Sequence, residues 1–592
     1  MDSANQLVFE KTVVKSEKAL VEQWLGQLDV ALQSESRAAV ASLFAPDGHW
    51  RDLLAFTWSI TPRQGAEDIA VLMTAKQATA KARGFALAEG RTPPRRVQRA
   101  GIDVIEGIFQ FETGVGRGFG VVRLLAGEPS RAIQLMTGLH ELKGFEEKVG
   151  KRRPTGEAFS RNFGGTNWTE QRIASQAYTD REPVVLIAGG GQAGLSLAAM
   201  LGRIGVDTLV VDRFERVGDC WRQRYHSLAL HNDTRFNHLP YMPFPPSWPT
   251  YLPKDMVADW FEAYAWAMEI NFWTSTELVS GTYDESTGRW NAVVRHADGP
   301  ERTLHPKHLI FANGLVGSPH IPQLPGLKDF KGDVLHTTEF TNGANWQGKK
   351  ALVIGTGTSG HDVAQDLHAN GCETTIVQRG STMVLSIDPS AKLVYGIYNG
   401  VPLEDGDLFA STNTKPIVKK NLQLLTARMV EFDRKTIDGL IARGFKFDNG
   451  EDGAGHQWKV RTRYGGYYLD AGCSQLIIDG EIGLLQYDQI EKFVADGAAL
   501  KDGSVKAVDL IILATGFVSQ EVVVAKLLGE EVAKKVGPVW GFGPDGEMSN
   551  MWKRTPQEGL WFVGGSFANC RTYSRYVAVQ VKAIEEGLLS KW

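Results

Sequence analysis

Two long stretches of the chain repeat the same order of apolar and polar positions. The first has an apolar run at 184–188, a glycine-rich turn, helical apolar spacing over 195–203 and a second apolar run at 209–211. The second stretch, 349–378, reads KKALVIG, a glycine-rich turn, a helical segment and then ETTIVQ. Short apolar runs joined by helical periods are typical of buried parallel strands. The pattern therefore predicts an α/β protein with two similar strand–helix–strand units.

The first glycine-rich turn has the spacing G-x-G-x-x-G. Gly189 permits the tight turn, Gly191 lets the backbone approach a pyrophosphate, and Gly194 lets the helix lie close to the strand. A pyrophosphate would lie on the free N–H groups of the helix, and Asp212, at the end of the second strand, would bind a ribose 2′-hydroxyl. Because strand, helix, second strand and acid occur in order, the stretch predicts a Rossmann-type dinucleotide site.

The second turn repeats the motif as Gly355, Gly357 and Gly360. Gln378 follows Gly355 at the distance at which Asp212 follows Gly189, and Arg379 comes next. An acid at this position favours a free ribose hydroxyl, whereas its loss together with an arginine favours a 2′-phosphate. We therefore expect FAD at the first unit and NADPH at the second. The alternative for Arg379 is a solvated surface arginine.

The region before the first unit predicts an α+β domain. Helical apolar spacing covers 17–44, and three strand-like runs follow at 105–112, 118–125 and 131–142. Helices followed by a bent antiparallel sheet resemble the nuclear-transport-factor-2-like (SnoaL-like) cone fold, over residues 15–145. The stretch FAPDGHW carries the resemblance best. His49, Trp50, Arg51 and Asp52 would line a pocket or, more simply, close the mouth of the cone.

Other segments connect or cover these units. Residues 143–182 are polar and predict a linker, whereas 221–251 is rich in proline and aromatic residues and predicts an ordered loop over the first site. Helical spacing at 418–441 predicts a packing helix rather than a membrane anchor, and 573–588 predicts a closing helix whose N-terminal end faces a flavin ring.

Composition limits the classes of function. The chain has 592 residues, 43% hydrophobic and 22% charged, with a net charge of −4. No long basic run is present, which argues against nucleic acid as a partner. We find no signal-peptide core and no spanning apolar segment, and the four cysteines are too scattered for a zinc site or a disulfide framework. These features predict a cytoplasmic protein without a metal site and without a membrane partner.

A third motif lies between the two glycine-rich turns. FKGDVLHTTEF fits F-x-G-x-x-x-H-x-x-x-F through Phe330, Gly332, His336 and Phe340, and an A-T-G-F strand follows at 509–517. With these four parts in order, residues 184–592 resemble the flavin-containing monooxygenases, the class B flavoprotein family. The resemblance implies that NADPH reduces FAD, that O2 forms a C4a-(hydro)peroxyflavin, and that bound NADP⁺ shields it until a small-molecule substrate arrives.

The resemblance also implies roles for two residues. Asn232 in ALHNDTR matches a family asparagine near the peroxide, with an Asx-turn as the alternative. His336 belongs to the fingerprint that couples the nucleotide domains, and we do not assign it to proton transfer. These two are the candidate catalytic residues.

Departures from the family pattern bear on the reaction. Baeyer–Villiger enzymes usually carry tryptophan and proline or aspartate where Phe340 and Thr341 stand, which favours oxygenation at N or S, of the N,N-dimethylaniline type. Baeyer–Villiger oxidation of a ketone and oxidative decarboxylation of a 2-oxo acid, as in the auxin-forming branch, remain alternatives. Thr358 replaces a common asparagine in the second glycine motif. A thiol reductase is disfavoured because Cys220 has no second cysteine nearby.

The predicted organisation has five parts: an N-terminal domain at 1–145, a linker at 146–183, FAD-binding parts at 184–328 and 506–592, and an NADPH-binding domain with a helical insertion at 329–505. We expect the N-terminal domain to be structural or a homodimer contact; a ligand-delivering module is the alternative. The expected cofactor-binding residues are Gly189, Gly191, Gln192, Ala193, Gly194, Asp212, Arg213, Trp221, Asn232, Ala312, Gly314, Gly355, Gly357, Thr358, Ser359, Gly360, Gln378, Arg379, Ala514, Thr515, Gly516 and Gly564.

Overall fold

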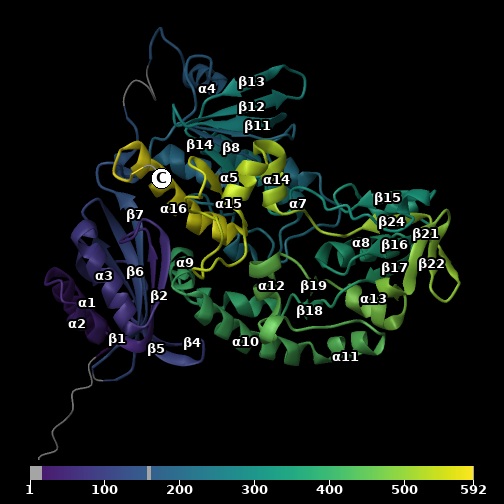
Figure 1. The fold of residues 1–592 in the computed structure, drawn as a ribbon, viewed down its shortest axis with the longest axis horizontal. Helices are drawn as coiled ribbons and strands as arrows, with labels where there is room; N and C mark the ends of the chain where they lie inside the picture. The colour runs from purple at the N-terminus through teal and green to yellow at the C-terminus, as the bar shows by residue number, and fades with distance from the viewer. Residues whose placement is uncertain (1–15, 128, 156–161, 591–592) are drawn as a thin grey trace, which may run out of the picture. The chain divides into compact units, whose positions relative to one another are not determined.

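The fold is given by a computed structural model, which describes residues 16–127, 129–155 and 162–590 (Figure 1). The expected start of the N-terminal domain, residues 1–15, lies outside this range. The described chain forms two compact units. The first comprises the chain up to Thr57, Thr61–Leu139 and the distant segment Leu408–Asn413, and the second comprises the remainder.

The first unit is a seven-stranded sheet with helices, in the order β2-β1-β7-β6-β5-β3, with β4 paired to β5. Trp24 and Trp50 are fully buried in its core. Its likeness to the nuclear-transport-factor-2-like fold stays a prediction. The elements are α1 (Glu17–Gln33), α2 (Arg37–Ser42), β1 (Phe44–Leu53), β2 (Ile60–Gln64), α3 (Ala66–Ala80), β3 (Arg83–Leu87), β4 (Arg95–Arg99), β5 (Ile102–Glu112), β6 (Gly116–Leu125) and β7 (Ala132–Leu142).

The second unit begins with the first dinucleotide fold, whose parallel sheet has the order β10-β9-β8-β14-β25. The closing helix α16 packs against α5. A small antiparallel sheet, β11-β12-β13, follows β10 along the chain. The elements are α4 (Trp168–Ala177), β8 (Val185–Ala188), α5 (Gln192–Arg203), β9 (Thr208–Val211), α6 (Asp219–Arg222), α7 (Lys254–Ala267), β10 (Asn271–Trp273), β11 (Thr276–Asp284), β12 (Arg289–His296), β13 (Glu301–Leu304), β14 (His308–Phe311), β25 (Leu560–Phe562) and α16 (Phe567–Glu585).

The second dinucleotide fold has a parallel sheet of the order β15-β24-β16-β17-β20, and α8 packs against β16 and β17. Its elements are β15 (Asp333–His336), β16 (Lys350–Ile354), α8 (Thr358–Ala369), β17 (Glu373–Gln378), β20 (Gly483–Gln486), β21 (Ile490–Val494), β22 (Gly497–Leu500), β23 (Val505–Ala507) and β24 (Leu510–Leu513). After β24 the chain returns to the first fold with α14 (Gln520–Leu528) and α15 (Glu530–Val536), and α14 packs against β11.

An insertion after β17 contains most of the remaining helices. Its elements are β18 (Met383–Ser386), α9 (Leu403–Ser411), α10 (Lys415–Phe432), α11 (Arg434–Ala442), α12 (Gly455–Arg463), β19 (Tyr467–Asp470) and α13 (Cys473–Asp479). Among the described residues, no helix is both long and apolar enough to cross a bilayer.

Three sequence predictions about organisation need correction. The boundary at 505/506 is wrong, because β24 pairs with β15 and β16 inside the second sheet. The linker at 146–183 contains the helix α4, which begins at a capping box formed by Asn167 and Glu170. The helix expected at 418–441 is broken into α10 and α11 at Asp433, whose carboxylate accepts a hydrogen bond from the backbone N–H of Ser386.

Candidate functional site

The glycines of the first turn are fixed by close backbone contacts. Gly189 has a φ of +114°, and a Cβ there would lie 2.5 Å from the carbonyl oxygen of Ala312. A Cβ on Gly194 would lie 2.0 Å from the carbonyl oxygen of Gly189. Gly191 differs, because the nearest atom to its Cβ position is the Cys220 Sγ at 3.8 Å. The first and third glycines are therefore needed for packing, and the middle one faces open space where a pyrophosphate fits.

A cavity of about 940 Å³ opens above this turn. Its lining includes the following residues that the sequence predicted as cofactor contacts: Gly189, Gly191, Gln192, Ala193, Asp212, Arg213, Trp221, Ala312, Gly314 and Gly564. The turn after β25, which leads into the N-terminal end of α16, also contributes Gly565. The cavity is thus built at the carboxyl ends of β8, β9, β14 and β25, where open α/β sheets bind their ligands.

Asp212 lies at the edge of this cavity and holds the glycine turn. Its carboxylate accepts hydrogen bonds from the backbone N–H groups of Gly190 (2.6 Å) and Phe214 (3.1 Å). Burial raises the pKa of Asp212 above the usual range, and the two N–H donors counteract this effect. The lone pairs that remain can accept the hydroxyls of a ribose, so the residues present fit FAD.

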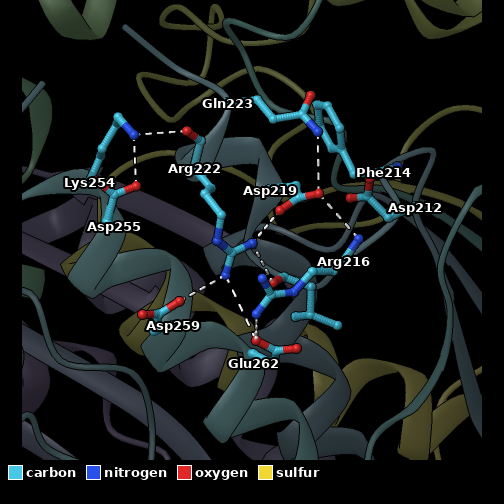
Figure 2. A network of polar contacts seen from close by, with 11 residues as sticks. Asp212, Phe214, Arg216, Asp219, Arg222, Gln223, Lys254, Asp255, Asp259 and Glu262 are labelled. Atoms are coloured by element: carbon cyan, nitrogen blue, oxygen red, sulfur yellow. Dashed lines mark hydrogen bonds and ion pairs between the residues drawn. The ribbon is translucent and has the colours of Figure 1, made fainter. Parts of the chain in front are cut away.

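A polar network next to Asp212 fixes α6, which carries Cys220 and Trp221 on the cavity wall (Figure 2). Asp219 accepts hydrogen bonds from the Arg222 guanidinium, from the backbone N–H of Arg216 and from Gln223. Arg222 also pairs with Asp259 (3.0 Å), and Arg216 pairs with Glu262 (2.6 Å), both on α7. Lys254 donates to the carbonyl oxygen of Arg222 and to Asp255. The network ties α6 to α7.

The second glycine turn repeats the geometry of the first. Gly355 has a φ of +123°, and its Cβ would lie 2.3 Å from the carbonyl oxygen of Ala514, while a Cβ on Gly360 would lie 2.1 Å from that of Gly355. The Cβ position of Gly357 is open, with the Tyr467 carbonyl oxygen at 3.9 Å. Thr358 and Ser359 form the first turn of α8, whose free N–H groups suit a pyrophosphate. The turn therefore fits a second dinucleotide.

Gln378 and Arg379 have different environments at the end of β17. The Gln378 side chain is buried, donates to the Lys446 carbonyl oxygen (2.9 Å) and accepts from the Lys446 N–H (2.7 Å). Arg379 is exposed and forms no hydrogen bond or ion pair within the described chain. Gln378 is thus turned inward and Arg379 outward, and a contact of Arg379 with a 2′-phosphate stays a prediction.

His336 joins the fingerprint to the loop after β24. Its Nε2–H donates to the Gly516 carbonyl oxygen (3.1 Å), and its Nδ1 accepts from the backbone N–H of Thr338 (3.2 Å). Burial lowers the pKa of His336, so the ring is neutral at pH 7. Thr515, next to Gly516, donates to the His320 carbonyl oxygen. His336 therefore holds two loops together.

Asn232 is not among the residues that line the cavity. Its carbonyl oxygen accepts from the Asn237 side chain (3.0 Å), as in a local loop contact. The preceding residue, His231, has a pKa lowered to about 4 by burial, and it lies near His456, whose pKa burial lowers to about 3. The structure therefore places two neutral histidines in this region, which sequence reasoning missed.

Several further cavity residues were not expected from the sequence. Cys220, Arg224, Leu278, Thr338 and Tyr464 line the cavity, although they come from separate parts of the chain. The sequence signal for Cys220 and Arg224 was their place in GDCWRQRY, beside the expected contact Trp221, and the signal for Thr338 was its place in the fingerprint FKGDVLHTTEF. Leu278 and Tyr464 carry no local motif.

The residues expected to line a pocket in the first unit are engaged in contacts with other residues of that unit. Asp52 is buried and accepts from Thr137, from Thr57 and from the N–H of Phe56, and Arg51 donates to the Ser411 carbonyl oxygen. Trp50 donates to Thr137, and His49 is buried. These contacts favour the structural interpretation of this stretch.

Comparisons with known proteins show the family of this chain. The family model described as flavin-binding monooxygenase-like matches residues 185–524. Indole-3-pyruvate monooxygenase YUCCA1 of Oryza sativa subsp. japonica is 30% identical over 342 residues, which are 57% of this chain and 77% of that protein. Probable indole-3-pyruvate monooxygenase YUCCA9 of Arabidopsis thaliana is 34% identical over 232 residues, 38% of this chain and 55% of that protein.

A solved structure shows the same fold. The OTEMO complex with FAD and NADP is 15% identical, has a TM-score of 0.50, and covers 69% of this chain and 87% of that one. The matched family residues include both glycine turns, the fingerprint and β24. The chain belongs to the flavin-binding monooxygenase-like family, and its cofactors are FAD and NADPH.

Proposed function

We propose that this protein uses NADPH and O2 to transfer one oxygen atom to a small organic molecule. The observation that carries the proposal is the pairing of two glycine turns of equal geometry in one compact unit, joined through His336 and Gly516. When bound, FAD accepts a hydride from NADPH and activates O2. The protein binds both cofactors, orients them and excludes water.

The first fold holds FAD through Gly191, Asp212 and the first turn of α5, and the second holds NADPH through Gly357 and Arg379. Trp221, Phe567 and Tyr464 lie at or next to the cavity and supply apolar surface. Such surface keeps water from the reacting atoms. That Asn232 lies near the reacting flavin atoms, as the family resemblance implies, stays part of the proposal, although Asn232 is not among the residues that line the cavity.

Which substrate atom receives the oxygen is also part of the proposal. The short fingerprint with Phe340 and Thr341 favours oxygenation at N or S. A second candidate, oxygenation of a 2-oxo acid with loss of CO2, is favoured by the relatives named indole-3-pyruvate monooxygenases. The Baeyer–Villiger alternative lacks an observation of its own.

The test is to measure NADPH oxidation, hydrogen peroxide release and product formation with a panel of tertiary amines, sulfides, ketones and 2-oxo acids. We expect a yellow protein that couples NADPH use to product with one of these classes. A protein that binds no flavin, or that produces only peroxide with every class, contradicts the proposal.

We further propose that the N-terminal unit is structural, as part of a cytoplasmic enzyme that forms homodimers. Glu106 is fully buried and bonded to Arg95, Arg99 and Arg123. Arg123 also donates to Asn413 and to the Phe409 carbonyl oxygen, so the unit encloses the segment Leu408–Asn413. Removing residues 16–139 should lower the unfolding temperature and the activity. Full activity of the shortened chain would contradict this role.

A further inference from the structure

Arg461, near the end of α12, is a deeply placed arginine without an acidic partner. Its Nη1 donates to the carbonyl oxygen of Gln457 (3.0 Å) and to the Gln457 Oε1 (2.8 Å). Its Nε and Nη2 have no protein acceptor in the part of the chain that the structure describes. Burial lowers the pKa of Arg461, yet the side chain keeps accessible surface. One edge of the guanidinium is therefore left without a partner among the described residues.

Two other deeply placed arginines of the same unit are paired with acids. Arg571 forms an ion pair with Asp407 at 2.7 Å, and Arg575 forms one with Glu147 at 2.9 Å. A buried charge without a partner destabilises a protein strongly, and pairing with an opposite charge offsets this cost. Arg461 differs from these two arginines, because no acid is bonded to it among the described residues. A bound anion would supply the missing partner.

The groups around Arg461 are aromatic and uncharged. The phenols of Tyr395 and Tyr573 lie close enough to interact with it electrostatically. Tyr573 stacks on Trp552 at 4.6 Å between ring centroids. The Trp552 ring contacts Trp540, whose ring contacts Tyr464. His456, one turn earlier on α12, is neutral because burial lowers its pKa to about 3. An apolar or aromatic body with one negative group suits these surroundings.

The position of α12 relates this space to both cofactor sites. Tyr464, which follows α12 with a φ of 54°, lines the cavity of the first fold. The carbonyl oxygen of Tyr467 lies at the second glycine turn, 3.9 Å from the Cβ position of Gly357, and accepts from Thr358 (3.5 Å). Arg461 therefore lies about one helical turn before the segment 464–467, which borders both the FAD cavity and the second glycine turn.

We propose that Arg461 binds the carboxylate of an aromatic or otherwise apolar substrate through Nε and Nη2. The inference rests on the proposed monooxygenase function and names the substrate class of that site. Two parallel N–H donors match the two oxygens of a carboxylate. The inference is compatible with oxygenation at N or S and with oxygenation of a 2-oxo acid. It disfavours cationic amines as substrates, because the arginine repels them. A phosphate of NADPH is the other source of anionic oxygens, and the experiment separates the two.

The experiment uses the flavin-loaded enzyme with Arg461→Gln, the conservative Arg461→Lys, and Arg463→Gln as the matched control. Arg463 is exposed on the same helix. The binding probes are 3-phenylpropionate and its methyl ester, titrated by calorimetry. We expect Arg461→Gln to weaken binding of the acid about 10- to 100-fold, with little change for the ester. Arg461→Lys should restore part of the affinity, and Arg463→Gln should behave as the wild type.

NADPH binding and anaerobic flavin reduction by NADPH are measured in the same proteins. Unchanged NADPH affinity in Arg461→Gln supports the carboxylate site, whereas a matching loss of NADPH affinity assigns Arg461 to a cofactor phosphate. Equal losses for acid and ester, or wild-type protein that binds neither probe, overturn the inference. If acid binding depends on Arg461 but no substrate class couples NADPH use to product, the proposed function fails and the anion site stands.

Discussion

The two dinucleotide folds have nearly the same glycine turns but differ at the end of their second strands. The third glycine approaches the first at 2.0 Å in one fold and 2.1 Å in the other, measured from the Cβ position to the carbonyl oxygen. Asp212 faces its cavity and binds the N–H of Gly190 in its own turn. Gln378 instead binds the backbone of Lys446, in the helical insertion. Equal backbone geometry is thus combined with two different side chains at the matching position, one open to the cavity and one bonded to the protein's own backbone.

The largest expected effects on cofactor binding come from substitutions of the middle glycine of each turn. Because the Cβ positions of Gly191 and Gly357 are open, a leucine there should fold but fill the space of the pyrophosphate. We expect Gly191→Leu to lose more than about nine-tenths of its bound flavin, which corresponds to at least ~1.4 kcal/mol of FAD binding. Gly357→Leu should keep the flavin and lose reduction by NADPH. Flavin absorbance and anaerobic reduction measure the two effects.

Gly202, exposed on α5 with no atom within 4 Å of its Cβ position, gives the matched control Gly202→Leu. It should retain both flavin and reduction. If Gly191→Leu keeps full flavin occupancy, the first site is placed wrongly.

Arg379 provides the next largest effect. Two charged hydrogen bonds to a 2′-phosphate contribute roughly 1.5–3 kcal/mol, or one to two powers of ten in affinity. Arg379→Ala should therefore raise the Kd for NADPH about 10- to 100-fold and leave that for NADH nearly unchanged. Arg434→Ala, an exposed arginine on α11, is the control. An equal loss of affinity for NADPH and NADH would mean that Arg379 does not bind the 2′-phosphate.

The sequence predicted the local parts of this architecture well. Glycine spacing, apolar runs and the residue at the end of the second strand are short-range signals, and each dinucleotide fold contains them within about thirty residues. The partner of an apolar run is a long-range property. DLIILATGF reads as a buried strand in either sheet, so the sequence did not assign β24 to the second one. Similarly, nothing near Leu408–Asn413 indicates that this segment joins the N-terminal unit.

The site shows the same division. Residues next to a motif, such as Asp212 and Trp221, line the cavity, whereas Tyr464 reaches it from the insertion without any motif. Asn232 was chosen from family resemblance in a loop of irregular structure, and its place near the reacting atoms stays a prediction. Arg461 could not be found from sequence, because its significance lies in the absence of an acid among its neighbours, and neighbours are set by packing.

A third prediction is that Gln378 stabilises the fold and does not select the nucleotide. Its side chain bonds the Lys446 carbonyl oxygen and N–H and accepts from Gln486 (3.1 Å). Gln378→Ala removes these part-buried hydrogen bonds and should lower the free energy of unfolding by about 1–3 kcal/mol. The ratio of NADPH to NADH affinity should not change. Urea unfolding and nucleotide titration test this, and a changed ratio would show that Gln378 contacts the nucleotide. Asp212→Ala, at the matching position, should lower FAD affinity instead.

The smallest effect concerns matching positions on the two helices. Asp362 on α8 follows Gly355 as Ser196 on α5 follows Gly189, but Asp362 accepts a hydrogen bond from Tyr225 at 2.6 Å. Burial raises the pKa of Asp362 to about 6, above about 3.9 in an unfolded chain. The folded state therefore favours the protonated acid, so this stabilisation is complete below about pH 4 and is lost as the pH rises through about 6.

We expect the wild type to lose about 1–2 kcal/mol more stability than Asp362→Asn between pH 4.5 and 6. Asp52 in the N-terminal unit also has a pKa of about 6 and adds the same slope to both proteins, so the difference between them isolates Asp362. Ser196→Ala, which removes a buried hydroxyl from the first helix, should leave the slope as in the wild type because serine does not titrate. Parallel pH profiles for the wild type and Asp362→Asn would show that Asp362 is ionised throughout. The contact with Tyr225 would then be a charged hydrogen bond, and the two helices would differ in charge as well as in side chain.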